Sequence, residues 1–279
     1  MQAFDYSKPA TVADALRAAG ADGAKLIAGG QSLLASMKLG LAAPQALVDL
    51  AAIADLTGIT VGSGVVKIGA MTTHAAVAAH AGLAAAIPAL ADLAGKIGDR
   101  QVRHRGTLGG SLANNDPAAC YPAALLGLGG TVHTDRRTIA ADDFFKGLFE
   151  TALAEGEVIT AVSFPVPDQA GWQKFKQPAS RFAIVGVFVS RGPQGVRVAV
   201  TGAGAGVFRA TGLEARLAAQ LPGSWSAAAL AGATVPADGL NSDLHGSAEY
   251  RAALIPVLAG RAVAACAGLL DRACLTVLS

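Results

Sequence analysis

The sequence predicts an α+β fold in two parts, and two observations support this prediction. The residues before Pro167 alternate between helical and strand-like spacing of apolar side chains, whereas the residues after it begin with consecutive strands and end in helices. This change of pattern predicts a boundary near residue 170. We therefore expect one domain over residues 1–170 and a second, made of a small antiparallel sheet plus helices, over residues 171–279.

The first part opens with a helix signal. Residues 7–20 carry apolar side chains at helical spacing behind a Ser7 or Thr11 cap, and Gly20 predicts where this helix ends. The segments that follow alternate. Strands are expected in residues 24–30 and 46–50, as a hairpin around the turn at 62–64, and in residues 127–167, with helices at 73–80 and 88–97.

The second part changes to antiparallel strands. Residues 172–191 and 195–204 are rich in Val and Phe and look like consecutive strands of one sheet. From Leu213 onward, helical patterns dominate up to the C-terminus. No fixed-period repeat is visible in the sequence.

Composition and charge exclude some classes of function. The chain is 52% hydrophobic and only 15% charged, against roughly 25% charged residues in a typical domain, which predicts a surface partly covered by a partner. The net charge is +2, with Lys and Arg scattered, whereas nucleic-acid binding needs clustered cations. Residues 1–6 lack the features of a signal peptide, and residues 68–91 read as two helical pieces broken near Pro88, not as a membrane span. A cytoplasmic location is expected.

The metal-binding residue types are sparse. Cys120, Cys266 and Cys274 are the only cysteines, and three thiols cannot supply the four ligands that an iron–sulfur cluster normally needs. The five histidines show neither HxxxH nor HExxH spacing, so no zinc site is expected. If this protein handles electrons, it does so without a metal cluster of its own.

Two glycine pairs, Gly29–Gly30 in KLIAGGQSLL and Gly109–Gly110 in RGTLGGSLANN, occur in similar surroundings. A tight turn that tolerates positive φ would explain either pair alone. Glycines also let main-chain N–H groups approach an anion, and each charge-assisted hydrogen bond contributes roughly 1.5–3 kcal/mol. Two such loops, one in each half of a two-lobed domain, would hold a dinucleotide between them. Their polar neighbours fit this function: Gln31, Ser32, Thr107 and Ser111.

Other nucleotide-binding motifs are incomplete. TGAGAGVFRATG, residues 201–212, follows a strand, but Val207 or Arg209 stands where a dinucleotide-binding motif needs its third glycine. A strand-to-helix turn is the better interpretation. The sequence contains no GxxxxGK[ST], which excludes a P-loop nucleotidase.

Several motifs in order resemble one family, the flavin-binding medium subunits of the molybdenum hydroxylases, which include aerobic carbon monoxide dehydrogenase and xanthine dehydrogenase-type enzymes. The motifs are AGGQSLL (28–34), MTT (71–73), QVRHRGTLGGSLANNDPAA (101–119), DDFF (142–145), FKQPASRFAIVGV (175–187) and GSAEYR (246–251). Each motif alone is weak. The ordered set is specific, and the resemblance runs almost from end to end.

The resemblance implies a fold and a cofactor. Members of this family bind extended FAD between two α/β lobes of a PCMH-type (vanillyl-alcohol oxidase-like) domain, here expected over about residues 1–55 and 56–170, and a CO dehydrogenase flavoprotein-like domain follows. The FAD-binding residues implied in this chain are Leu26, Ala28, Gly29, Gly30, Gln31, Ser32, Leu33, Thr107, Gly109, Gly110, Ser111, Asn114, Asp116, Ala119 and Lys176.

The resemblance also assigns parts of FAD to these residues. The two glycine loops would hold the diphosphate, while Asn114, Asp116 and Ala119 would line the ribityl and ribose side. Lys176 would lie near the pyrimidine end, where a cation stabilises negative charge on the reduced flavin. Many relatives carry an acidic residue in place of Cys120, so a ribose contact that this acid makes elsewhere would be weak or absent here.

The implied function is that of an oxidoreductase subunit that transfers electrons. A large partner subunit would carry the molybdenum–pterin cofactor, a small one would carry two [2Fe–2S] clusters, and this chain would pass electrons through FAD to an external acceptor, in a dimer of heterotrimers. No catalytic acid, base or nucleophile is expected. A self-contained PCMH-type FAD oxidase or reductase and a flavin-storing or assembly protein are the alternatives. The substrate of the complex is not determined: carbon monoxide, a purine or other N-heterocycle, and an aldehyde all remain open.

Overall fold

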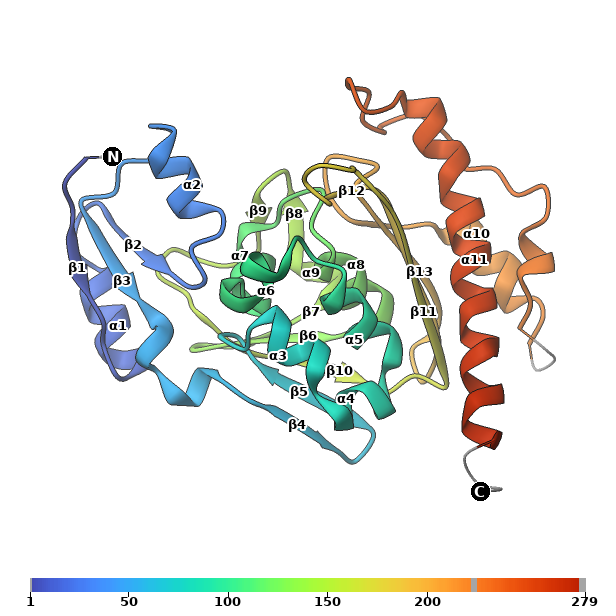
Figure 1. Ribbon diagram of the computed structural model, residues 1–279, viewed down its shortest axis with the longest axis horizontal. Helices are drawn as coiled ribbons and strands as arrows, with labels where there is room; N and C mark the ends of the chain where they lie inside the picture. The colour runs from blue at the N-terminus through green and yellow to red at the C-terminus, as the bar shows by residue number, and fades with distance from the viewer. Residues whose placement is uncertain (1, 222–224, 276–279) are drawn as a thin grey trace.

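The computed structural model describes residues 2–221 and 225–275 (Figure 1). Its elements form a small N-terminal lobe, a larger second lobe, and a C-terminal sheet with helices. Figure 1 shows the three parts side by side, from the blue lobe at the left to the red helix at the right. The predicted α+β class is confirmed.

The first lobe is a three-stranded parallel sheet with two helices. Strands β1 (Asp5–Ser7), β3 (Ala46–Asp49) and β2 (Ala24–Ile27) lie in that order. Parallel neighbours need crossover connections, and α1 (Val12–Ala19) and α2 (Leu33–Lys38) form part of them. Thr11, not Ser7, caps α1 by accepting a hydrogen bond from the Asp14 amide. Strand β2 ends directly before the first glycine pair.

The second lobe is built on a five-stranded antiparallel sheet of order β4-β5-β10-β6-β7. Its strands are β4 (Ile59–Gly62), β5 (Val65–Gly69), β6 (Thr131–Thr134), β7 (Thr138–Ala140) and β10 (Ile159–Pro165), and β8 (Phe145–Gly147) and β9 (Glu150–Thr151) form a separate hairpin. Its helices are α3 (His74–Ala79), α4 (Ala81–Ala86), α5 (Pro88–Gly95), α6 (Arg100–Arg105), α7 (Leu108–Asn114), α8 (Tyr121–Leu128) and α9 (Ala141–Phe144).

Helix α4 was not expected as a separate element. His80 makes it one, because its ring Nδ1 accepts a hydrogen bond from the Leu83 amide at 3.0 Å and caps a new helix directly after α3. The second glycine pair lies in the first turn of α7, whose N-cap is Thr107.

The C-terminal part is a four-stranded antiparallel sheet of order β11-β12-β13-β14. Its elements are β11 (Gln169–Lys176), β12 (Ala183–Gly192), β13 (Gly195–Thr201), β14 (Phe208–Arg209), α10 (Thr211–Ala218) and α11 (Ala248–Leu275). Helix α11 packs along β11 and β12, while α8 of the second lobe contacts β12 and β13 (Figure 1). Because helices cover both faces, eight consecutive residues from Ala183 are buried.

The second lobe and the C-terminal sheet share one apolar core. All residues of α8 are buried, and a Cβ at Gly127 would lie 2.8 Å from the Phe188 ring, so glycine permits this close approach. The sheet also bonds carbonyls near the end of α8: Ser190 Oγ donates to Gly127 O at 2.6 Å, and Arg197 Nε donates to Leu126 O at 2.7 Å. Over the residues described, no helix is both long and apolar enough to cross a bilayer.

Candidate functional site

One cavity brings the two glycine loops together. It has a volume of about 520 Å³ and lies between the first lobe, the second lobe and the loop that joins β11 to β12. Cavities of this size, lined by apolar groups with a few convergent polar groups, are typical of cofactor sites. Its walls come from residues 25–33, 70–74, 97–120, 153–159 and 174–182.

The structure brings the predicted site residues together, with one exception. The residues that line the cavity are Leu26, Ala28, Gly29, Gly30, Gln31, Ser32, Leu33, Thr107, Gly109, Gly110, Ser111, Asn114, Asp116 and Ala119. Lys176 does not line it.

The first loop offers unpaired main-chain donors to the cavity. The amide groups of residues 29–32 donate no hydrogen bond to any described residue. Gly30 has a φ of +70°, a conformation that glycine adopts without strain. Ser32 precedes α2, but its side chain makes no capping bond and its hydroxyl bonds no other residue that the structure describes. A row of free amides beside a helix N-terminus is an arrangement that binds anions.

The glycines let the two loops touch. A Cβ at Gly29 would overlap the carbonyl group of Arg105. A Cβ at Gly110 would lie 2.9 Å from Thr107 Oγ1 and 3.2 Å from Ala28 Cβ. The absence of side chains at these positions therefore serves close packing between the lobes, in addition to any approach of a ligand.

The second loop contributes side chains more than amides. The Leu108 and Gly109 amides donate to Thr72 O and Ala70 O, and the Gly110 amide donates to Thr107 Oγ1 at 3.1 Å. These donors are therefore already satisfied within the protein. The side chains of Ser111 and Asn114 line the cavity and form no hydrogen bond within the described residues.

Lys174, not Lys176, is the lysine of β11 that reaches the cavity. Side chains two residues apart on a regular strand share a face, but the pairing of β11 with β12 shifts register between Phe175 and Lys176. Lys176 is exposed beyond this irregularity. Sequence reasoning missed Lys174 because alternation alone does not reveal where a register shift falls.

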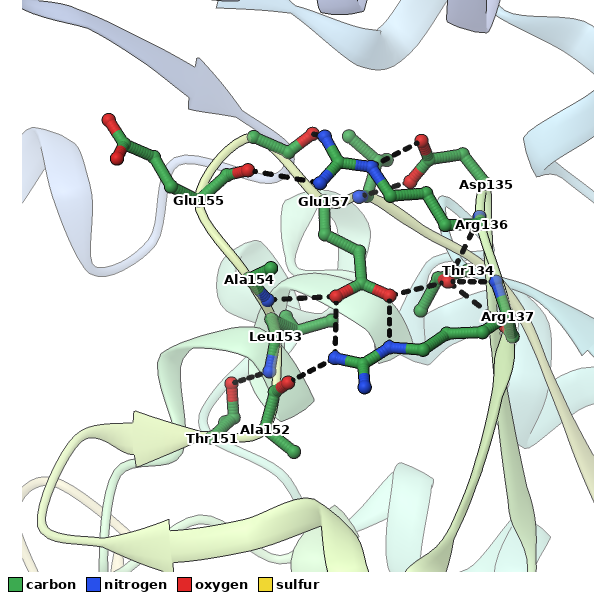
Figure 2. Close-up of polar contacts among 12 residues, drawn as sticks. Thr134, Asp135, Arg136, Arg137, Thr151, Ala152, Leu153, Ala154, Glu155 and Glu157 are labelled. Carbon is green, nitrogen blue, oxygen red and sulfur yellow. Dashed lines mark hydrogen bonds and ion pairs between the residues drawn. The ribbon is translucent and has the colours of Figure 1, made fainter.

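Glu157 lines the cavity. Its carboxylate is held in a network of hydrogen bonds (Figure 2). Both of its carboxylate oxygens accept from Arg137, at 2.9 Å each, while the Thr134 hydroxyl and the Ala154 amide donate at 2.7 and 2.8 Å. The bonds from Arg137 lower the pKa of Glu157 to about 2, although burial acts in the opposite direction. The carboxylate is therefore ionised and paired.

His74 is a second residue that sequence reasoning did not place here. Its side chain lines the cavity, the residue is only 4% exposed, and its Nδ1 is buried without a hydrogen-bond partner. Burial lowers the pKa of His74 to about 4, and the charge of Arg103 adds to this effect. The ring is therefore neutral near pH 7. The preceding MTT motif was the available signal in the sequence.

The polar groups available in the cavity fit an anionic dinucleotide. Free amides of residues 29–32, uncommitted side chains of Ser32, Ser111 and Asn114, and the unpartnered His74 ring converge on one cavity. Of these groups His74 is buried, and a buried polar atom without a partner is costly, so a ligand that bonds it stabilises this arrangement. Elsewhere, in residues 2–221 and 225–275, no group of three or more His, Cys, Asp or Glu side chains is placed to hold a metal ion.

Comparisons with known proteins agree with this geometry. The family model for the FAD binding domain in molybdopterin dehydrogenase matches residues 2–167. The nicotine 6-hydroxylase medium subunit of Paenarthrobacter nicotinovorans is 36% identical over 274 residues, covering 94% of this chain and 97% of that protein. The carbon monoxide dehydrogenase medium chain of Afipia carboxidovorans is 37% identical over 279 residues, covering 93% and 95%.

Solved structures show the same fold. Carbon monoxide dehydrogenase from Hydrogenophaga pseudoflava matches with a TM-score of 0.84 and 32% identity, covering 96% of this chain and 98% of that one. Quinoline 2-oxidoreductase from Pseudomonas putida 86 matches with a TM-score of 0.84 and 30% identity, at the same coverage.

Fold, site and comparisons together define an FAD-binding oxidoreductase subunit. The chain belongs to the family of FAD-binding medium subunits of molybdenum hydroxylases. The resemblance inferred from the ordered motifs is thereby confirmed, as is FAD as the cofactor of this subunit.

Proposed function

We propose that this chain binds FAD in the cavity between its glycine loops and transfers electrons within a three-subunit molybdenum hydroxylase. One observation carries the proposal: two loops in direct contact, one of which presents the free amides of residues 29–32 to a cavity of about 520 Å³. Bound FAD would supply the redox chemistry by which this subunit accepts electrons from a partner's clusters and passes them to an external acceptor.

The residues of the chain bind and orient this cofactor. Amides 29–32 would hold the diphosphate, because unpaired N–H groups bind anionic oxygens strongly. The side chains of Ser32, Ser111 and Asn114 would bond the remaining polar groups. Of the two lysines of β11, Lys174 and not Lys176 would act as a cation of this site, since Lys174 lines the cavity and Lys176 does not. No acid–base side chain is needed for electron transfer.

The end of the family match supports the proposed division into domains. The family match ends at residue 167, directly before β11 begins at Gln169, which agrees with an FAD-binding domain over residues 1–170 and a second domain over 171–279. Because the second lobe and the C-terminal sheet share a core, the two domains would unfold together.

The proposal includes two partner subunits in a dimer of heterotrimers. The relatives are themselves medium subunits or chains, and in this chain the apolar side chains of Phe175, Phe182, Leu244 and Tyr250 are exposed. Relatives that carry the names of nicotine, carbon monoxide and quinoline enzymes share this fold, so we assign substrate choice to the large partner. A cytoplasmic location remains a prediction.

Cofactor analysis of the purified complex and of this chain tests the proposal. We expect one FAD per copy of this chain, with the two-band absorption spectrum of an oxidised flavin, and iron and molybdenum only in fractions that contain the partner subunits. Tightly bound iron in the isolated chain, or a complex free of FAD, would contradict the proposal.

A further inference from the structure

Lys174 connects three segments that are far apart in the sequence. Its Nζ donates to Lys96 O at 2.8 Å and to Arg181 O at 2.9 Å, and it lies 3.4 Å from Cys120 Sγ. A lysine ammonium has three N–H groups, so these contacts use all of them. The ammonium is therefore held in place by the protein itself.

One of these partners, Lys96, belongs to a turn whose carbonyls accept from several cationic side chains. Helix α5 ends at Gly95, and the carbonyls that follow all accept from cationic side chains: Lys96 O from Lys174, and Gly98 O from Arg103 at 3.0 Å and Arg181 at 3.3 Å. Carbonyls at a helix C-terminus carry partial negative charge and favour such donors.

The loop of residues 177–182 is also held together by hydrogen bonds of its own. The Gln177 amide donates to Phe182 O, the Arg181 amide donates to Gln177 O, and Gln177 Oε1 accepts from the Ser180 amide at 2.6 Å. Arg181 has a φ of +63°, which is uncommon for a residue with a side chain. The contacts of Lys174 and Arg181 with the turn offset this strain.

All of these groups lie at one end of the cavity. Ile97 and Gly98 of the turn, Cys120, Lys174, and residues 180–182 of the loop line it together. The loop and the turn therefore form one wall, and Lys174 bonds both sides of it, in addition to the direct and longer bond from Arg181 to Gly98 O.

We propose that Lys174 is a positioning residue that fastens the loop of residues 177–182 to the turn after α5 and so closes this end of the cavity. Closure shields the Cys120 thiol and slows release of the bound nucleotide. The second effect rests on the proposed function, whereas the first belongs to the protein without cofactor.

The first test uses the protein without cofactor. It measures the rate at which Cys120 reacts with a thiol reagent, with peptide mass spectrometry to identify the modified cysteine. Lys174→Met should raise this rate by about tenfold or more, as expected for loss of one charge-assisted hydrogen bond. The loss of charge by itself would slow the reaction. Burial raises the pKa of Cys120 and Lys174 lowers it, so removing the ammonium disfavours the reactive thiolate. A faster reaction therefore reports opening.

Three comparisons make this result specific. Lys96→Met removes a nearby cation, whose Nζ pairs with Asp92, but keeps the carbonyl that Lys174 bonds, and it should leave the Cys120 rate unchanged. Cys266, buried on the side of α11 that packs against β11, should react equally slowly in every variant, which shows that the fold is intact. Lys174→Arg should restore part of the protection. Unchanged Cys120 reactivity in folded Lys174→Met overturns the proposal.

The second test measures release of FAD from the assembled complex by the return of flavin fluorescence. Lys174→Met should release FAD about tenfold faster than the wild type, and Lys96→Met at the wild-type rate. Lys174→Met could instead alter only the flavin reduction potential and leave the release rate and the Cys120 reaction unchanged. That result would overturn the proposal, because Lys174 would then act through its charge on the flavin and not by holding the loop to the turn. A wild-type complex without FAD would instead refute the proposed function and leave the thiol result standing.

Discussion

Gly29 lies directly against the main chain of Arg105, so closely that a single Cβ on the glycine would overlap the Arg105 carbonyl group. This contact joins the loop after β2 in the first lobe to the end of α6 in the second. The two lobes are therefore in contact through Gly29 of the first lobe, which has no side chain, and the backbone of Arg105 in the second.

Gly29→Ala should separate the two loops. Neither backbone can move without shifting its lobe, so we expect a loss of stability of about 1–3 kcal/mol and the loss of most bound FAD. Thermal unfolding and the FAD-to-protein absorbance ratio measure both. Gly62→Ala is the matched control, because no atom lies within 4 Å of the position of its Cβ. Full FAD occupancy in Gly29→Ala would show that loop contact is not required.

Gly110→Val should abolish FAD retention while the C-terminal sheet stays folded. The new side chain would press on Thr107 Oγ1 and Ala28 Cβ, both of which face the cavity from opposite lobes. Retained FAD is measured after gel filtration, and the slow reaction of Cys266 with thiol reagents reports the C-terminal core. Wild-type flavin content in this variant would remove Gly110 from the site.

Glu157 should make the stability of the protein depend on acid pH. Its pKa is lowered to about 2 in the folded state, so its contribution is fully present above about pH 5 and is lost as pH falls toward 2. Glu157→Gln keeps the shape but loses the charge, and should be less stable at pH 7 by about 2 kcal/mol, with a smaller decline over that range. Urea unfolding at several pH values measures this. Parallel pH profiles for the two proteins would contradict the assigned ion pair.

His74 should make the stability of the protein depend on pH over a higher range than Glu157 does, because burial and not an ion pair shifts its pKa. Its pKa falls to about 4 on folding, so the unfolded chain binds a proton that the folded chain does not between about pH 6.5 and 4, and stability declines as pH falls through this window. His74→Asn should show a flatter profile there. The FAD affinity of the wild type should not vary between pH 6 and 8, since the ring stays neutral. An inflection of affinity near pH 6.5 would place a charged His74 in the site.

The ordered motifs were sufficient to predict the family, the cofactor and the two glycine loops that line the cavity. They succeed because glycine pairs and their polar neighbours are local features, visible wherever the chain later folds. The predicted strand-to-helix turn at residues 201–212 also appears, with the short β14 inserted. The extra helix α4 was missed because a histidine, not Ser, Thr, Asp or Asn, provides its cap.

Two features could be decided only by the tertiary structure. Whether Lys174 or Lys176 reaches the cavity depends on a register shift between β11 and β12, which is a property of the pair of strands and not of either segment. Whether a loop amide is free depends on what packs beside it: those of Leu108 and Gly109 are bonded by the strand end at Ala70 and Thr72, while those of residues 29–32 are not. The sequence by itself predicted that the two glycine loops would meet. Long-range packing determined which of their polar groups remain available for a ligand, because hydrogen bonds made inside the protein remove donors from the site.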